Sequence, residues 1–197
     1  LVSLHGQHEH QTLLRREEQR AILDAYAGNE GRLGEVAAAY EALRDMSSLG
    51  YHCFETWGSV LSDQEQKGVL REMIERNGIP LRSAFMGINV HDPSKLKESI
   101  QQVIAWGKVL MKHGGTFAVV NAGGIDRETF NFEEARPHII SGLNDHGKAL
   151  NDIGLNCGLH QHTGSAVDDP EQVYSVMEAV DTRYMKFAPD VGQLQKA

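Results

Sequence analysis

The chain has 197 residues and a formal net charge of -8 at pH 7, with 41% hydrophobic and 23% charged residues. This composition is typical of one globular domain with a substantial core. Lysine and arginine are scattered among acidic residues, so the basic stripe of a nucleic-acid-binding protein is missing. No apolar run approaches the roughly 18 residues of a membrane span. Nucleic acids and membranes are therefore not the expected partners.

The chain shows no signal peptide, and we expect a cytoplasmic protein. Because the chain begins with Leu1 and not with methionine, an export signal that has been removed stays an open alternative. Cys53 and Cys157 lie within apolar strand patterns, which predicts buried free thiols and no disulfide. The ten histidines are more than a domain of this size normally carries, which favours a role in metal binding or proton transfer.

Short apolar segments alternate with amphipathic ones along the chain. In chain order we expect a strand over 1–5, helices over 11–28 and 35–50, a strand over 51–57, a helix over 64–78, a strand over 79–90, a helix over 93–115, a strand over 116–124, a helix over 133–154, a strand over 155–162, a helix over 169–181 and a strand over 184–193. About six strand–helix repeats of roughly 30 residues each are typical of a parallel sheet with helical crossovers.

Two parallel architectures compete for this pattern. A doubly wound sheet that binds a nucleotide would carry a glycine-rich phosphate motif after its first strand, and the residues after His5 form no such motif. A (β/α)8 barrel collects functional residues at the carboxyl ends of many strands. The expected strand ends here carry His5, Glu55, Trp57, Asn89, His91, Asn121, His160, His162 and Asp190. We therefore predict an α/β (β/α)8 TIM barrel, with about the first six βα units in one domain over 1–197.

The segment GLHQHTG, residues 158–164, poses the functional question most directly. Alternation along a strand places His160 and His162 on one side and Gln161 on the other. Any single strand-end residue has a plain structural explanation, such as a helix cap for Glu55 or a turn for Asn121. Polar residues at every successive strand end favour a site, because buried polar groups cost free energy unless they serve a partner.

From GLHQHTG onward the sequence resembles the xylose-isomerase-like TIM barrels, whose members include sugar isomerases and epimerases, inosose dehydratases and apurinic-site endonucleases. The resemblance is closest to inosose dehydratases and related sugar isomerase/epimerase-like proteins. Their fifth strand ends in a histidine-rich run and their sixth in an Asp-x-Gly-His signature. LGYHCFETWG, residues 49–58, is similar to the family's second strand, which ends in glutamate. The match is strongest from Gly158 onward and weak before Gly34.

The resemblance implies one divalent cation, with manganese expected first and cobalt, magnesium or zinc as alternatives. It places His160 where many members have a glutamate ligand and Asp190 on the strand-six aspartate ligand. His162 falls at a flanking position that usually faces the substrate. An imidazole and a carboxylate on adjacent strands also suit a borderline divalent ion on chemical grounds.

Two departures from the family pattern stand out. The strand-six signature reads Asp190-Val191-Gly192-Gln193, and glutamine can hydrogen-bond a substrate hydroxyl but cannot carry protons as histidine does. A full barrel typically needs about 250 residues. The resemblance puts the remaining ligands, a histidine and a glutamate, on later strands, so we expect the C-terminal part of the barrel to be missing from this sequence.

The resulting hypothesis is a divalent-metal-dependent isomerase or epimerase that acts on a keto-sugar or cyclitol through an enediolate. His162 and Glu55 are the candidates for proton transfer, and His160 and Asp190 for metal binding. The candidate substrate contacts are Trp57, Gln193, Asn121 and His5. Trp57 would stack on the apolar face of a sugar ring.

Other functions stay open. A lyase of the same fold, by dehydration or by β-elimination from an oxidised glycoside, needs the same enolate chemistry. A non-catalytic sugar-binding or partner subunit is the second alternative, because Gln193 weakens the site. An endonuclease would need a basic groove to bind DNA, and the net charge of -8 argues against such a groove. The sequence leaves a homo-oligomer open.

Overall fold

The computed structural model describes residues 30–126 and 128–194, and their centre is a parallel five-stranded sheet. Its strands are β1 (Phe54–Trp57), β2 (Leu81–Gly87), β3 (Phe117–Asn121), β4 (Asn156–Leu159) and β5 (Met185–Phe187). Strands that follow one another along the chain are also neighbours in the sheet, and every pair is parallel. This is the strand order of the predicted (β/α)8 barrel, of which the chain forms a part.

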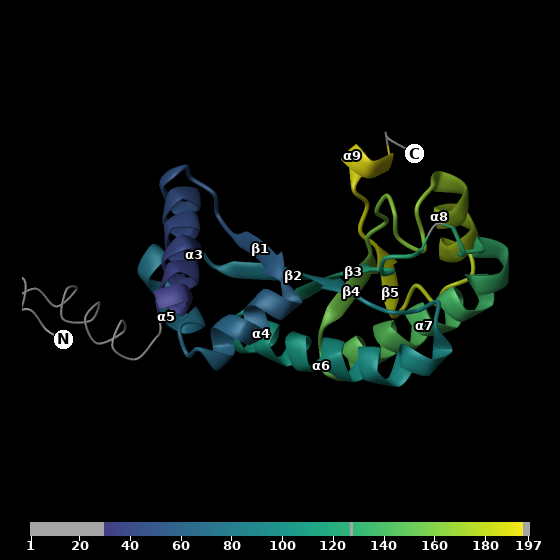
Figure 1. Cartoon of the computed structure of the whole chain (residues 1–197), viewed down its shortest axis with the longest axis horizontal. Coiled ribbons are helices and arrows are strands. Elements are labelled where there is room, and N and C mark those ends of the chain that lie inside the picture. The colour runs from purple at the N-terminus through teal and green to yellow at the C-terminus, as the bar shows by residue number, and fades with distance from the viewer. Residues whose placement is uncertain (1–29, 127, 195–197) are drawn as a thin grey trace, which may run out of the picture.

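Helices precede, connect and follow the strands. They are α3 (Glu30–Ser48), α4 (Gly58–Gln66), α5 (Leu70–Asn77), α6 (Leu96–Lys112), α7 (Phe132–Asp152), α8 (Pro170–Met177) and α9 (Val191–Leu194), with a 3-10 turn η1 (Pro93–Lys95) before α6. Of these, α4, α6 and α7 cover one face of the sheet, and Figure 1 shows them side by side beneath the strands. The expected strand over 1–5 and the expected helix over 11–28 lie outside the described residues.

Alternate residues of each strand point into the core between the sheet and these helices. On β2 and β3 these residues are small or apolar, and the helices meet them with leucines. Fully buried members of this core are Ala84, Met86, Ala118, Val120, Leu159, Met185, Leu110, Leu143 and Leu150. Burying one such large apolar side chain contributes about 1.5–3 kcal/mol, so this face fixes the sheet to its helices.

The other face of the sheet carries the polar strand-end residues. Strand register places Trp57, Phe85, Val119, Gly158 and Lys186 in one row across the five strands. Residues two positions further along each strand face the same side and lie nearer the carboxyl edge, and His160 is one of them. A Cβ at Gly158 would lie 3.0 Å from the Phe117 ring and 3.0 Å from the Cβ of Ala188, so a larger residue in this row would displace these neighbours.

Several element boundaries differ from the sequence prediction. The single helix expected over 64–78 is wrong: α4 begins earlier, at Gly58, and α5 begins at Leu70. Gly68 separates them in a left-handed conformation, with φ of +72°, which glycine adopts without strain. The last expected strand also ends early, at Phe187, so Asp190 lies in the turn that precedes α9.

Cys53 and Cys157 are both free thiols in the structure, which confirms the prediction that they form no disulfide. Cys157 is buried in β4, whereas Cys53 is partly exposed just before β1. Within residues 30–126 and 128–194, none of the helices combines the length and the apolar character that crossing a membrane requires.

Candidate active site

His160 and Asp190 meet at the carboxyl edge of the sheet. His160 directly follows β4, and Asp190 follows β5, the neighbouring strand. The Nε2 atom of His160 lies 3.6 Å from Oδ2 of Asp190, and the two side chains are 17% and 33% exposed. The parallel strands thus bring together two residues that are 30 positions apart in sequence, at a place that solvent and small molecules can reach.

The two carboxylate oxygens of Asp190 have different surroundings. Oδ1 accepts hydrogen bonds from the backbone N–H groups of Gly192, at 2.8 Å, and Gln193, at 3.0 Å. The bond from Gln193 is the largest cause that lowers the pKa of Asp190, and the bond from Gly192 and the nearby His160 and His162 lower it further. Asp190 is therefore held as a carboxylate, with Oδ2 directed towards His160.

His162 is exposed and lies next to Gln193 on the same edge. The His162 Nδ1–H donates to the carbonyl of Thr163 at 2.9 Å, which leaves Nε2 as the proton-accepting nitrogen. The Thr163 hydroxyl donates to Oε1 of Gln193 at 2.8 Å, so the Gln193 amide nitrogen faces His162 Nε2 at 3.5 Å. Gln193 thus contacts both Thr163 and His162 with an amide group that does not titrate.

Aromatic rings extend from His160 across the exposed face of the sheet. The rings of Trp57 and Phe85 meet edge-on with centroids 4.4 Å apart, and Phe85 meets His160 edge-on at 5.6 Å. Trp57 is 58% exposed, so its ring is open to a ligand. Glu55 lies two residues before Trp57, faces the same side and accepts a hydrogen bond from the Ser83 hydroxyl.

Two buried amide side chains underlie the exposed groups. Asn121, at the end of β3, donates from Nδ2 to the carbonyl of His160 at 3.2 Å and accepts from the N–H of Gly123 at 3.1 Å. Gln161 is completely buried and bonds to the backbone of Asp190. Sequence reasoning put Gln161 on the opposite side from the histidines but gave it no role.

The separation of the two candidate ligands fits a shared divalent cation. Nitrogen and oxygen ligands lie about 2.0–2.2 Å from such an ion, so two of them at a tetrahedral angle are about 3.4 Å apart. The observed 3.6 Å between His160 and Asp190 is close to this spacing. In the part of the chain that the structure describes, no group of three or more His, Cys, Asp or Glu residues is arranged to hold a metal ion.

The predicted site residues thus gather in two groups. His160, Asp190, His162 and Gln193 form a polar cluster after β4 and β5, and Trp57 and Glu55 lie on β1 with Phe85 between Trp57 and His160. Asn121 lies beneath the cluster with both amide atoms bonded to backbone. His5 lies outside the described residues.

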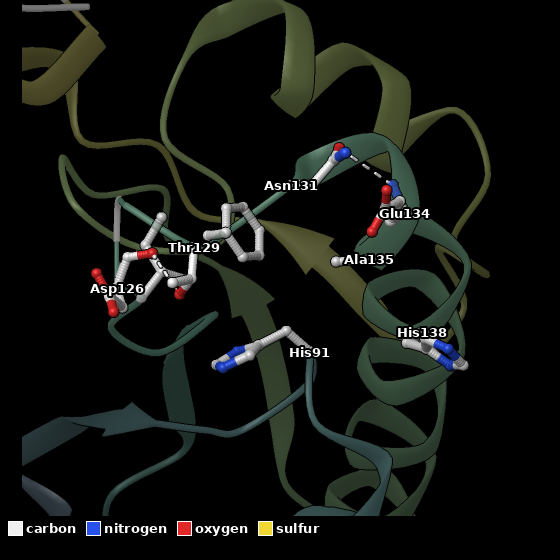
Figure 2. Close-up of a pocket in the computed structure, with 9 residues that line it drawn as sticks. His91, Asp126, Thr129, Asn131, Glu134, Ala135 and His138 are labelled. Carbon is white, nitrogen blue, oxygen red and sulfur yellow. Dashed lines mark hydrogen bonds between the residues drawn. The ribbon is translucent and has the colours of Figure 1, made fainter.

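A separate pocket of about 360 Å³ opens beside this edge and contains none of the predicted site residues. Figure 2 shows it between the loop after β2, which carries His91, and the start of α7, which carries Glu134 and His138. The His91 ring packs edge-on against Phe130 with centroids 6.0 Å apart. His91 lies in the loop after β2, beyond the end of the strand.

The structure is part of a parallel barrel, with an imidazole–carboxylate pair at the carboxyl edge of its sheet. This arrangement is typical of TIM-barrel proteins, whose functional residues lie at the carboxyl ends of the strands. Residues 43–197 match the model of the family described as xylose isomerase-like TIM barrel. The chain belongs to this family.

The chain is similar to inosose dehydratase from Geobacillus kaustophilus, with 26% identity over 175 residues, which cover 81% of this chain and 55% of that protein. The chain thus spans about half the length of this relative. A short match of 48 residues, 54% identical, covers 23% of the chain and 9% of the DNA repair protein RecN from Xylella fastidiosa.

Solved structures share the fold. 3-Keto-D-glucoside 4-epimerase YcjR from E. coli matches with a TM-score of 0.63 and 16% identity, over 79% of this chain and 64% of that one. A xylose isomerase-like TIM barrel protein from Mycobacterium smegmatis, in complex with magnesium, matches with a TM-score of 0.63 and 14% identity, over 78% and 56% of the two chains.

Proposed function

We propose that the chain carries part of the active site of a divalent-metal-dependent isomerase or epimerase that acts on a keto-sugar or cyclitol through an enediolate. The observation that supports this most is the approach of His160 Nε2 to Asp190 Oδ2, 3.6 Å, at the carboxyl edge of the sheet. Membership of the xylose isomerase-like family and the epimerase fold neighbour support the reaction class. Because the chain spans about half of its curated relative, the activity is proposed for the whole protein.

The side chains divide the chemical tasks. His160 and Asp190 would hold the cation, which when bound supplies Lewis-acid polarisation of a carbonyl and the adjacent hydroxyl. The Nδ1–H of His162 donates to the Thr163 carbonyl, so Nε2 is the nitrogen that would accept the α-proton of the substrate, in place of the Gln193 amide that faces it at 3.5 Å. Gln193, held by Thr163, has an amide nitrogen that can donate to a substrate hydroxyl.

The exposed face of β1 supplies further contacts for a sugar. Trp57 offers an open aromatic ring on which the apolar face of a pyranose or cyclitol can stack. Glu55, on the same face, is the second candidate for proton transfer. Returning the proton at the neighbouring carbon gives isomerisation, and returning it to the opposite face of the same carbon gives epimerisation.

Dehydration is the second candidate, because the chain is similar to inosose dehydratase over 81% of its length. Both reactions begin when a base removes the proton next to a carbonyl. In dehydration the enediolate then expels the β-hydroxyl as water, whereas an epimerase reprotonates it. A conjugated product that absorbs in the ultraviolet would distinguish the lyase from the isomerase.

The test starts with binding of Mn²⁺, Co²⁺, Mg²⁺ and Zn²⁺ to the protein by calorimetry. Incubation with keto-sugars and inososes in D₂O, followed by NMR, then detects deuterium at the α-carbon and identifies the product. Asp190→Asn removes the charge that offsets the cation and should nearly abolish both metal retention and turnover. Asp169→Asn is the matched control, because Asp169 also caps a helix, with Oδ1 accepting from the Gln172 N–H at 2.8 Å.

Asp169→Asn should keep the metal affinity and turnover of the wild type. If the protein exchanges no α-proton with any carbonyl substrate, or if Asp190→Asn keeps full metal binding and activity, the proposed function is wrong.

A further inference from the structure

Gln161 directs its whole amide group at one residue of the candidate site. Its Nε2 donates to the backbone carbonyl of Asp190 at 2.8 Å, and its Oε1 accepts from the backbone N–H of Asp190 at 3.4 Å. The side chain is completely buried. Both polar groups of the Asp190 backbone are therefore bound by one side chain from the segment that follows β4.

This contact begins where the sheet ends. The last backbone hydrogen bond between the two chain segments runs from the Ala188 N–H to the Leu159 carbonyl at 2.9 Å. The N–H of His160 bonds on its other side, to the Val120 carbonyl at 2.7 Å. Past these bonds, the amide of Gln161 continues the connection between the segment after β4 and the segment after β5.

The contact also fixes the direction of the Asp190 carboxylate. Oδ1 is bound by the N–H groups of Gly192 and Gln193, and the backbone of Asp190 is bound by Gln161. With the backbone and one oxygen held, Oδ2 has little freedom, and it faces His160 Nε2 at 3.6 Å. Ligand groups that are held in place before binding cost less conformational entropy when the ion binds.

We propose that Gln161 is a positioning residue that holds Asp190 against His160, so that the two side chains are preorganised as a ligand pair. The proposal rests on the metal-binding part of the proposed function. A buried amide costs free energy unless its donor and acceptor are satisfied, and here the Asp190 peptide satisfies both.

Gln161→Met is the test variant, because methionine fills a similar volume but forms neither hydrogen bond. Gln64→Met is the matched control: Gln64 is also a buried glutamine, but it lies on α4, and its Oε1 contacts no hydrogen-bond donor among the described residues. Binding of Co²⁺ is followed by calorimetry and by the visible absorption of the saturated protein, which reports coordination geometry. Circular dichroism checks that each variant is folded.

We expect Gln161→Met to bind Co²⁺ about 10–100-fold more weakly than the wild type, the usual effect of losing a group that orients a ligand. Its absorption at saturation should also change, which a loss of stability alone does not cause. Gln64→Met should match the wild type in both measurements. Equal affinity and an identical spectrum for Gln161→Met and the wild type would overturn the proposal.

Crystal structures of the metal-free wild type and variant separate this proposal from the proposed function. If the wild type binds no Co²⁺, the metal-binding part of the proposed function is wrong. The distance between His160 Nε2 and Asp190 Oδ2 in the two structures then tests separately whether Gln161 positions Asp190. An increase of about 1 Å or more in the variant supports the proposal, since misplacement of that size disables a site, and an unchanged distance overturns it. Gln161→Asn is used if Gln161→Met does not fold, because it keeps an uncharged amide but is one methylene shorter, which moves both polar atoms away from the Asp190 peptide.

Discussion

Replacing His146 with glutamine should remove a specific part of the pH dependence of stability. His146 is completely buried in α7. Its Nδ1–H donates to the Gly142 carbonyl at 2.7 Å, and Nε2 accepts from the Ser99 hydroxyl at 2.8 Å. The Ser99 oxygen in turn accepts from the N–H of Asn89 at 2.9 Å. This chain of bonds ties the loop after β2 to α6 and α7, and the bond to the Gly142 carbonyl places the proton of the neutral imidazole on Nδ1.

The direction of the effect follows from the pKa of His146. Burial lowers this pKa below its ordinary value of 6.5, and the hydrogen bond to Gly142 and the charge of Asp145 offset only part of that effect. The unfolded chain takes up a proton near pH 6.5, whereas the folded protein does not. The stabilisation is therefore complete above pH 6.5 and is lost as the pH falls towards the folded pKa. One proton corresponds to a slope of at most about 1.4 kcal/mol per pH unit.

Urea unfolding at a series of pH values from 7.5 downwards measures this slope for the wild type and for His146→Gln. Glutamine cannot titrate, so the variant should lose less stability per pH unit than the wild type below pH 6.5. His138→Gln is the matched control, because His138 is an exposed histidine on the same helix. Equal slopes for the wild type and His146→Gln would refute the reasoning, and so would an equal effect of the control.

Three further outcomes follow from single residues. Gly123→Ala should lower the free energy of unfolding, measured in urea, by about 2 kcal/mol or more, because φ is +74° and a Cβ would lie 2.5 Å from the carbonyl oxygen of Ile88. Gly124→Ala is the control and should be nearly neutral, because a Cβ there would have no atom within 4 Å. Iodoacetamide at pH 8 should alkylate Cys53 well before Cys157 by mass spectrometry, since burial raises the pKa of the Cys157 thiol to about 12; equal rates would contradict this. His162→Asn should keep metal binding and slow turnover by roughly 10²–10⁴-fold, as for a lost general base; unchanged turnover in a kinetic assay would remove His162 from the mechanism.

The strand–helix order was predictable from the sequence because apolar periodicity is a local signal. The start of α4 was not, because it depends on a tertiary contact. A Cβ at Gly58 would lie 2.7 Å from the ring of Trp106 on α6, so the helix begins at a residue without a side chain. The early end of β5 has a local cause that apolar periodicity does not capture: the carboxylate of Asp190 binds the amides of Gly192 and Gln193 and starts α9 instead of continuing the strand.

The candidate site was predictable to the extent that strand ends are. His160, His162 and Asp190 were found because parallel strands bring their carboxyl ends to one edge, whatever the details of packing. The role of Gln161 was not accessible, because its two bonds reach a residue 29 positions away. Alternation indicated only that Gln161 faces away from the histidines, and a buried glutamine has many potential partners.

The strand-end rule alone does not separate residues that face a ligand from residues that hold the backbone. Asn121 and His160 both stand at strand ends on the same face of the sheet. Asn121 uses both its amide atoms on backbone groups, one of which is the carbonyl of His160. His160 keeps Nε2 for the carboxylate of Asp190. If a ligand binds here, Asn121 should therefore act through His160. The side chains that contact the ligand should be those whose polar atoms form no hydrogen bond with the backbone.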